Sequence, residues 1–506
     1  MSRPFRDSGR AEAGSRDPFI GLLQAALAIV LLAAVAITLV LLVGVAPPRA
    51  SAAVRRVPPG SAVPAIASAS DGDTLLLAAG VHRGPITIAR RVALIGEPGA
   101  VVDGGGRGSV ITVAAGGVRI ERLSIRASGD KAEDLDSGVR LTSAPGARLA
   151  HLRLENVRYG IAAERCDDLD VEECTLTGRV VPSIDAAPEM DVAAGNGIHV
   201  WYSRGARVRR TEIRRFMDGI YLSFADSIRI EGCGSSGNGR YGLHTMYCQD
   251  NRIAENRFTG NIAGCAIMFS NHLELARNDF MHNRGPRTYG ILLRDCSDGF
   301  FHENRLVDNT IAVFMDGSNR NHIHGNLVQD DGWGVILFSS CDGNEFAGND
   351  FVNIDYPVAL DMRRTDNRFD DGARGNYWSA SAPYDLNADG IGDVPYGPVS
   401  AFAFLSKQYP DLAIFGESPA AGALSLAERT IPALRPSEAL DHYPLVHPAG
   451  AGVGSRSAAG DLPAAASFGS DPASGTRRAA PRAAAAGFLL LAGAGAIGIA
   501  RRRGPR

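Results

Sequence analysis

A repeat of 22 to 26 residues fills the middle of the chain, and it limits the possible folds more than any other feature. Each copy begins with a small residue followed by alternating apolar residues, as in NGIHVWYS, DGIYLSF, YGLHTMYC, AGCAIMFS and YGILLRDC. The small residue recurs at Gly197, Gly219, Gly242, Gly264, Gly290, Ala312 and Gly334. A second marker recurs beside it at Asn256, Asn278, Asn304, Asn326, Asn349 and Asn376. Two markers that keep one period indicate a solenoid of stacked turns.

The strands within each repeat are short, alternate with period two, and show no helical stripe. Leucine-rich repeats of similar length need a Leu/Asn consensus that the chain lacks. The pattern therefore predicts an all-β chain, a right-handed parallel β-helix over residues 53–396. Asparagine at a fixed place in each turn predicts an inward amide ladder. The 59 glycines suggest corners with positive φ, and residues 178–195 are too many for one corner and should project as a loop.

Both ends of the chain resemble membrane segments. Residues 1–18 are basic and precede an apolar run at 19–46, which fits a transmembrane anchor or, because Ala50-Ser51-Ala52 supplies a small-x-small site, a cleaved signal peptide. A second apolar run at 483–500 precedes the basic tail 501–506, and it fits a transmembrane helix or a low-complexity tail. The basic flanks predict that both termini are cytoplasmic and that the body between them lies outside.

Two further segments separate the β-helix from the second apolar run. Residues 397–448 change period towards short amphipathic helices, which we expect to dock on the end of the solenoid or on another membrane protein. Residues 449–482 are rich in Ala, Gly, Ser and Pro, a composition typical of a flexible tether.

Charge and cysteine content exclude several classes of protein. The net charge of −3 combines basic ends with an acidic middle, and an acidic body argues against nucleic acid as a partner. Seven cysteines are present without a CxxC motif, so neither a zinc ribbon nor a thioredoxin-like site is supported. Cys166 and Cys174 form the close pair that could form a disulfide, and buried small hydrophobes are the expectation for most of the others.

Alternation within the repeated strand separates an inner face from an outer face. Counting from the small residue, positions +1 and +3 are apolar and should form the core, so positions +2 and +4 point outward. The outward set is unusually rich in aromatic, Met and His side chains, which marks a surface for a partner or ligand. The predicted partner-binding residues are His199, Trp201, Tyr221, Phe314 and Phe338.

A possible copper site lies within this outward set. His244 and Met246 are two residues apart on one strand, and Met268 occupies the matching position one turn later. One imidazole and two thioethers form a soft ligand set suited to Cu(I). His199 is two turns from His244, about 9.6 Å, which is too far to share one ion but close enough for a relay. The alternative is a protein-docking face in which methionine gives adaptable contacts.

Two further groups of polar residues could have structural roles. The remaining histidines, His272, His282, His302, His322 and His324, fall near corners and are expected to be solvent-exposed or structural. Asp385, Asn387, Asp389 and Asp393 are spaced like the start of an EF-hand loop and suggest calcium. Tyr396 stands where the bidentate glutamate would be, so a tight Asx-rich turn is the alternative.

Three motifs give a specific family resemblance over about residues 55–448: YGLHTMYC, GNYW…YDLNADGIGDVPY and DHYPL. They resemble the NosD family of periplasmic β-helical accessory proteins for the maturation of nitrous oxide reductase. The resemblance implies a protein that is not an enzyme. It implies action with the permease and ATPase subunits of an ABC transporter, a copper chaperone and the reductase during assembly of the copper-sulfide centre. It favours copper at His244, Met246 and Met268. The two apolar runs depart from the family pattern and suggest tethering of a periplasmic body to the inner membrane.

Two other functions are open to a β-helix. A polysaccharide lyase or C5-epimerase needs clustered carboxylates with Arg or Lys on an outward face, whereas this stripe offers only Arg294 and Asp316. An adhesive or structural solenoid predicts a polar surface without a local His/Met cluster.

Overall fold

The computed structural model describes residues 26–35, 52–179, 195–286, 288–415, 418–430 and 437–450. The chain divides into two compact units, Met1–Ala52 and Ala53–Arg506. In the first unit, residues 26–35 form a helix whose side chains are exposed. Among the described residues, no helix combines the length and apolarity that crossing a membrane requires. The predicted segments 1–18, 483–500 and 501–506, most of 19–46 and 449–482, and the loop residues 180–194 lie outside the described residues.

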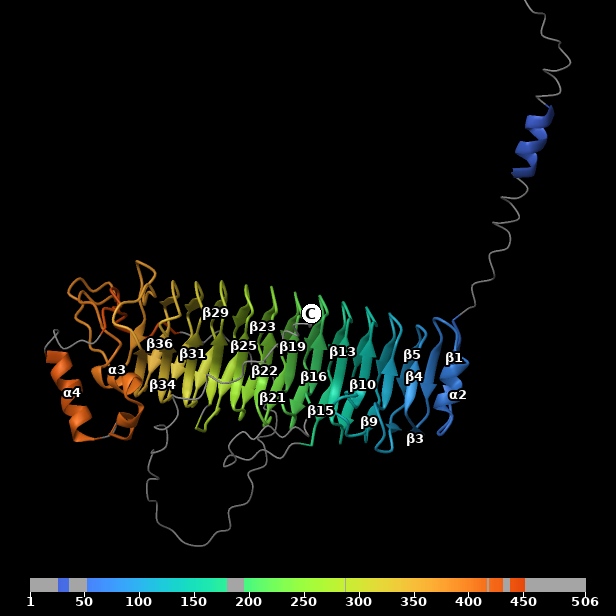
Figure 1. Cartoon of the computed structure of the whole chain (residues 1–506), viewed down its shortest axis with the longest axis horizontal. Helices are drawn as coiled ribbons and strands as arrows, with labels where there is room; N and C mark the ends of the chain where they lie inside the picture. Colours follow the sequence, from blue (N-terminus) through green and yellow to red (C-terminus); the bar gives the residue numbers. More distant parts are fainter. Residues whose placement is uncertain are drawn as a thin grey trace, which may run out of the picture. The chain divides into compact units, whose positions relative to one another are not determined.

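The second unit is a parallel β-helix, as the repeat predicted (Figure 1). Its three sheets contain only parallel strand pairs among the described residues, and successive turns contribute successive strands to each sheet. The β1 sheet consists of β1 (Val54–Val57), β2 (Thr74–Leu77), β5 (Ala93–Gly96), β8 (Arg119–Glu121), β11 (Arg148–Ala150), β14 (Asp170–Glu172), β17 (Arg207–Arg209), β20 (Arg229–Glu231), β23 (Arg252–Ala254), β26 (Glu274–Ala276), β29 (Phe300–His302), β32 (His322–His324) and β35 (Glu345–Ala347).

The other two sheets complete each turn. The β4 sheet consists of β4 (Ile86–Ile88), β7 (Ile111–Val113), β10 (Ser137–Thr142), β13 (Tyr159–Glu164), β16 (Ile198–Trp201), β19 (Ile220–Ser223), β22 (Tyr241–Met246), β25 (Ala263–Met268), β28 (Tyr289–Arg294), β31 (Ile311–Asp316), β34 (Trp333–Leu337) and β37 (Tyr356–Leu360). The β3 sheet consists of β3 (Gly80–Arg83), β6 (Ala100–Asp103), β9 (Ser124–Arg126), β12 (Arg153–Glu155), β15 (Thr175–Thr177), β18 (Glu212–Arg214), β21 (Gly234–Ser236), β24 (Arg257–Thr259), β27 (Asp279–Met281), β30 (Arg305–Val307), β33 (Leu327–Gln329), β36 (Asp350–Val352) and β38 (Tyr377–Trp378).

The inward residues of the three sheets form one continuous apolar core. In the β4 sheet the strands pair in register, so that Ile198 lies beside Ile220 and Leu243 beside Cys265. Positions +1 and +3 of each repeat are buried, as the alternation predicted. Helix α2 (Ala62–Ala67) places Ala62 and Ile66 in this core at the N-terminal end.

Asparagine side chains form ladders that run through the buried corners of the turns. The predicted ladder is confirmed: from Asn256 to Asn376, each Nδ2–H donates to the Oδ1 of the next asparagine at 2.8–3.0 Å. Two further ladders run at other corners, through Asn238, Asn261, Asn283 and Asn309 to Asp331, and through Asn321, Asn344 and Asn367. Their amides satisfy backbone N–H groups that the corners leave without strand partners.

Many glycines have positive φ, as expected, among them Gly205, Gly232 and Gly260, but the repeated marker glycines do not. They lie at the start of the β4-sheet strands, where a Cβ at Gly242 would come within 2.6 Å of the Gly264 carbonyl oxygen. A Cβ at Gly264 would come equally close, 2.7 Å, to the Gly290 carbonyl oxygen. Glycine is needed there for the close approach of one turn to the next, while many positive-φ corners carry other residues, such as Tyr202 and Tyr247.

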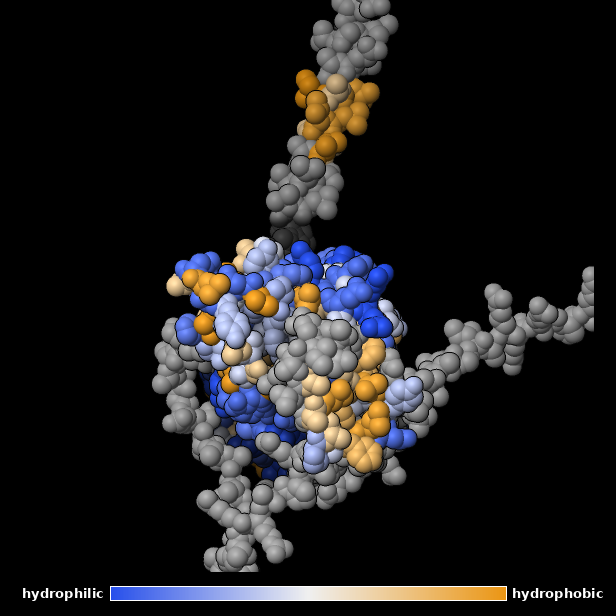
Figure 2. Space-filling view, turned by 90° about the vertical axis from the view of Figure 1, so that its left-hand side faces the viewer, coloured by the Kyte–Doolittle hydropathy of each residue, from blue (hydrophilic) through white to orange (hydrophobic). Residues whose placement is uncertain are grey.

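Helical segments cover the outer face of the last turns. Helix α3 (Ala401–Gln408) packs on β37, with Ala403 buried against Ile336 and Ala359. The 3-10 helix η1 (Pro410–Phe415) and helix α4 (Pro419–Thr430) follow. Figure 2 views this end of the β-helix and shows apolar side chains gathered on one part of it, beside a hydrophilic remainder.

Residues 437–450 return to the last turn of the β-helix. The Asp441 side chain is fully buried and accepts hydrogen bonds from Asn376 N–H at 2.7 Å and Trp378 Nε1–H at 2.8 Å. It therefore closes the longest asparagine ladder. Burial raises the pKa of the Asp441 carboxyl to about 6. The GNYW and DHYPL motifs, which are distant in the sequence, thus meet in one buried contact.

Candidate functional site

Three aromatic rings lie in a row across successive strands on the outer face of the β4 sheet, each tilted against the next. His199 of β16 pairs in register with Tyr221 of β19, which pairs with His244 of β22. Their ring centroids are 4.8 Å apart between His199 and Tyr221 and 4.7 Å apart between Tyr221 and His244. The two histidines therefore lie two turns apart, as the period predicted, with the tyrosine ring between them.

The two methionines lie on the same face, beside these three rings. Met246 of β22 and Met268 of β25 are direct partners in register, and both are half-buried. The Tyr221 hydroxyl donates to the Met246 sulfur at 3.5 Å. The strands therefore bring His244, Met246 and Met268 to neighbouring positions of one face, where the sequence predicted them.

A buried carboxylate orients the His244 ring. Asp218, which precedes β19, has no exposed surface. It accepts hydrogen bonds from Arg240 Nε at 2.8 Å and from Arg240 Nη2 at 2.6 Å. The His244 Nδ1 atom lies 3.0 Å from the Asp218 carboxylate. Burial opposes ionisation of Asp218, but the contacts with Arg240 and His244 outweigh it and lower the pKa of the carboxyl. Asp218 is therefore a carboxylate that can only accept hydrogen bonds.

This arrangement determines which nitrogen of His244 is available to a ligand. Because the carboxylate only accepts, we assign the imidazole proton to Nδ1, which in the neutral ring leaves the lone pair on Nε2. His244 Nε2 is buried and has no hydrogen-bond partner. A carboxylate that holds the far nitrogen of a histidine is the usual outer contact of a metal-binding imidazole. The free Nε2 and the adjacent thioethers are donors that fit a soft metal ion.

His199 offers a second unpartnered imidazole nitrogen. Its Nδ1 atom is buried without a hydrogen-bond partner, as is Nε1 of Trp201 on the same strand. Burial lowers the pKa of His199 to about 4, so the ring is neutral at pH 7. His199 and Trp201 line a small pocket together with Ala162 and Glu164 of β13.

The outer face is less exposed than the sequence suggested. His244 is only 5% exposed, and Ala266 and Leu292 are also buried. Phe314 and Phe338 pack against a small apolar cluster that includes Ala403 of α3. At this end helix α3 packs on the same apolar cluster, and Phe314 and Phe338 are partly buried, so their role in binding a partner stays a prediction.

The predicted calcium loop has its oxygen atoms engaged by its own backbone. Asp385 accepts hydrogen bonds from Asp389 N–H at 3.2 Å and Gly390 N–H at 2.9 Å. Asn387 Oδ1 accepts from Asp389 N–H at 3.0 Å, and Asp393 accepts from Leu386 N–H at 2.6 Å. These contacts are those of a tight Asx-rich turn, the alternative to calcium.

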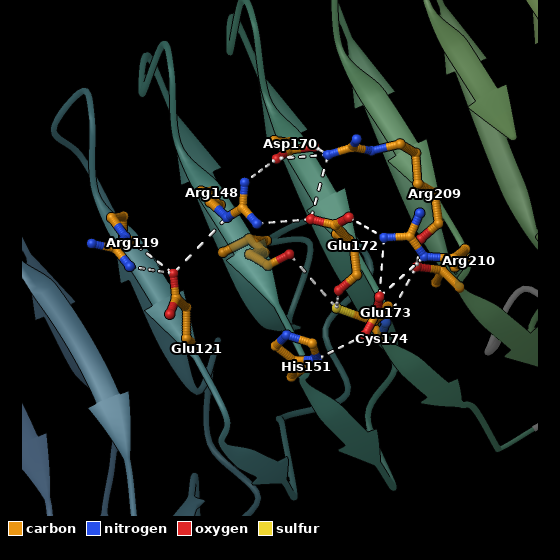
Figure 3. Close-up of polar contacts among 12 residues, drawn as sticks. Arg119, Glu121, Arg148, His151, Asp170, Glu172, Glu173, Cys174, Arg209 and Arg210 are labelled. Carbon is orange, nitrogen blue, oxygen red and sulfur yellow. Dashed lines mark hydrogen bonds and ion pairs between the residues drawn. The ribbon is translucent and has the colours of Figure 1, made fainter.

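A charged ladder that the sequence pattern did not predict lies on the outer face of the β1 sheet (Figure 3). Arg148 contacts Asp170 at 2.9 Å and Glu172 at 2.7 Å, and Arg209 reaches Asp170 at 2.9 Å. Arg119 pairs with Glu121 at 2.7 Å. The arginines labelled in Figure 3 each contact a carboxylate.

The predicted disulfide is absent. Cys166 and Cys174 are both buried free thiols, and burial raises the pKa of Cys174 to about 12. The other five cysteines are also buried free thiols, as expected of small hydrophobes in the core.

Two groups of candidate functional residues were not identified from the sequence. Asp218 lies directly before the marker Gly219 and Arg240 lies two residues before the marker Gly242, and these charged residues at the start of a repeat were a signal that could have shown them. His322 and His324 were expected to be exposed or structural, but they lie close to Glu345, and the three residues could hold a metal ion. Their i, i+2 spacing on a strand was the available signal.

A family model and two related proteins that match this chain all carry the name NosD. The family described as "Periplasmic copper-binding protein (NosD)" matches residues 180–382. A protein of Stutzerimonas stutzeri, "Probable ABC transporter binding protein NosD", is 27% identical over 73% of this chain and 86% of its own length. A protein of the same description from Pseudomonas aeruginosa PAO1 is 29% identical over 74% of this chain and 89% of its own.

Among solved structures, the A-module of the mannuronan C-5 epimerase AlgE6 from Azotobacter vinelandii is similar, with a TM-score of 0.48 and 13% identity. That similarity covers 60% of this chain and 90% of the module.

Proposed function

Because the chain belongs to the NosD family, we propose that it is a periplasmic accessory protein that binds and passes on copper during the maturation of nitrous oxide reductase. In this role copper is cargo for the copper-sulfide centre of the reductase. The partners in the proposal are a copper chaperone, the permease and ATPase subunits of an ABC transporter, and the reductase itself. The body acts in the periplasm, tethered to the inner membrane.

The observation that supports copper binding most strongly is the unpartnered Nε2 of His244. A buried imidazole nitrogen without a partner has a free-energy cost that a bound metal ion would remove. The ring is already oriented by Asp218, and two thioethers lie on the same face. We propose His244, Met246 and Met268 as ligands of Cu(I), the ion that imidazole and thioether donors favour.

The row of three rings suggests a second position for the ion. His199 has its own buried, unpartnered nitrogen and is joined to His244 through the Tyr221 ring. We propose that His199 receives copper from, or passes it to, the His244 position. The half-buried Trp201 and Tyr221 beside it are then part of the docking surface for the chaperone.

Anaerobic competition for Cu(I) between the full chain and a chromophoric chelator tests the proposal. We expect one tightly bound equivalent, with affinity at least about tenfold lower in His244→Ala and in Met246→Leu. His151→Ala and Met281→Leu are matched controls, since His151 is exposed at the corner between β11 and β12 and Met281 is half-buried on β27. Binding unchanged in both site variants would refute the ligand assignment, and absence of Cu(I) binding by the full chain would refute the copper role.

The same preparation tests the alternative enzyme class. A polysaccharide lyase or C5-epimerase would convert polyuronate, which is followed by product absorbance or by NMR. We expect no turnover, and measurable turnover would replace the accessory function. Co-purification of the tagged full chain with the permease subunit from detergent-solubilised membranes tests the transporter partnership.

A further inference from the structure

Two histidines and a glutamate converge on the outer face of the β1 sheet. His322 and His324 lie two residues apart on β32, so that both side chains point to the same side of the sheet. Glu345 of β35 is the direct register partner of His322. The parallel stacking thus brings three donor groups from two turns to one place.

The donor atoms are close enough to share an ion. Glu345 Oε1 lies 2.9 Å from His324 Nε2 and 3.5 Å from His322 Nδ1. One ligand atom from each residue can be chosen so that all three lie within 4.8 Å of one another. Ligands of Zn²⁺ with bonds of about 2.0–2.1 Å are about 3.3 Å apart in a tetrahedron, so small side-chain rotations would complete the geometry.

One observation distinguishes this cluster from a set of surface ion pairs. His324 Nε2 is buried and lies 2.9 Å from Glu345 Oε1, yet the geometry of this contact is not that of a hydrogen bond.

The surroundings of the cluster hold the glutamate in place. Arg368 contacts the other carboxylate oxygen of Glu345, Oε2, and leaves Oε1 directed at both histidines. Ligating carboxylates are commonly fixed by such an outer hydrogen bond. The half-exposed Phe300 ring forms a wall beside the site, with its centroid 6.0 Å from the His324 ring.

We propose that His322, His324 and Glu345 bind a divalent cation of borderline softness, with Zn²⁺ as the representative ion. Two imidazoles and one carboxylate form a ligand set typical of such cations, whereas the imidazole and thioether set at His244 is soft. The two sites lie on different sheets, so this proposal goes beyond the proposed copper function and does not depend on it.

Competition for Zn²⁺ between the full chain and a chromophoric zinc chelator tests the site. We expect one equivalent to bind, with affinity about tenfold or more lower in His322→Ala and in Glu345→Gln. His322 is exposed, so its replacement leaves the core intact, and the melting temperature of the variant verifies this. His302→Ala is the matched control, because His302 lies on the neighbouring strand and contacts Glu274 instead.

A second readout separates coordination from nonspecific binding. Co²⁺ added to the full chain should give a visible absorption band that His322→Ala removes and that His302→Ala and His244→Ala retain. The proposal is overturned if the full chain binds no Zn²⁺, or if all variants bind it equally. Loss of Zn²⁺ binding in His244→Ala would also overturn it, since the ion would then occupy the other site.

Discussion

Replacing Asp218 by Asn tests whether the carboxylate behind His244 prepares the imidazole for copper. The substitution keeps the size of the side chain and removes its charge. One carboxylate oxygen accepts from Arg240 Nε, and the other accepts from Arg240 Nη2 and from His244 Nδ1. An amide has one accepting oxygen, so it cannot serve both positions.

Either orientation of the new amide disturbs the site. With its NH2 group towards His244, the amide donates to Nδ1 and moves the imidazole proton to Nε2, where it blocks the proposed copper ligand. With its NH2 group on the other side, the amide donor faces the Nε–H donor of Arg240, and neither has an acceptor there. Loss of an outer contact of this kind lowers metal affinity by about 10–100-fold, or about 1.4–2.8 kcal/mol. We expect Cu(I) binding by Asp218→Asn to weaken within this range.

The measurement is the anaerobic Cu(I) competition, made beside thermal unfolding of the same protein. Asp226→Asn is the matched control, because Asp226 pairs with Arg204 at 3.4 Å and accepts from Gln249 N–H at 3.0 Å without contacting His244. Wild-type affinity in Asp218→Asn, combined with a loss in His244→Ala, would show that the carboxylate does not prepare the ring. Equal losses in the two Asp variants would refute a specific role for Asp218.

Two further predictions concern stability. Asn304→Ala removes the oxygen that accepts from Asn278 N–H at 2.9 Å and from Asn278 Nδ2–H at 3.0 Å. We expect it to lower the free energy of unfolding, measured in urea, by about 2–6 kcal/mol. A loss no larger than that of the exposed Asn353→Ala variant would contradict this prediction. Because burial lowers the pKa of His199 to about 4, the unfolded chain binds a proton between pH 6.5 and about 4 that the folded chain does not. The melting temperature should therefore fall over this window as the pH is lowered, and fall less in His199→Phe; identical pH profiles of the two proteins would contradict the assignment.

The fold and the placement of the predicted site residues followed from local pattern. Strand alternation placed Ile198 and Leu243 in the core and His244 on the opposite face, because the side-chain period of a strand is fixed. The repeat length then put Met268 beside Met246, since parallel in-register turns stack equivalent positions. These inferences needed no knowledge of distant contacts.

Other features depended on contacts that pattern does not show. The packing of Ala403 against Ile336 and Ala359 came from α3, a segment far along the chain, whose docking the repeat does not encode. The role of Gly242 came from the distance between turns, which sequence spacing does not contain. The pairing of Arg240 with Asp218 depends on corner geometry, which the spacing of the repeat does not contain.

The buried contact made by Asp441 has a practical consequence for the smallest piece of the protein that can fold. The strands end at Trp378, but Asn376 N–H and Trp378 Nε1–H find their acceptor 63 to 65 residues further along the chain. A truncation placed after the last strand would expose the open end of the amide stack and leave both donors unsatisfied. The folding unit therefore extends at least to Leu445, whose N–H binds the Asn376 carbonyl oxygen at 2.9 Å.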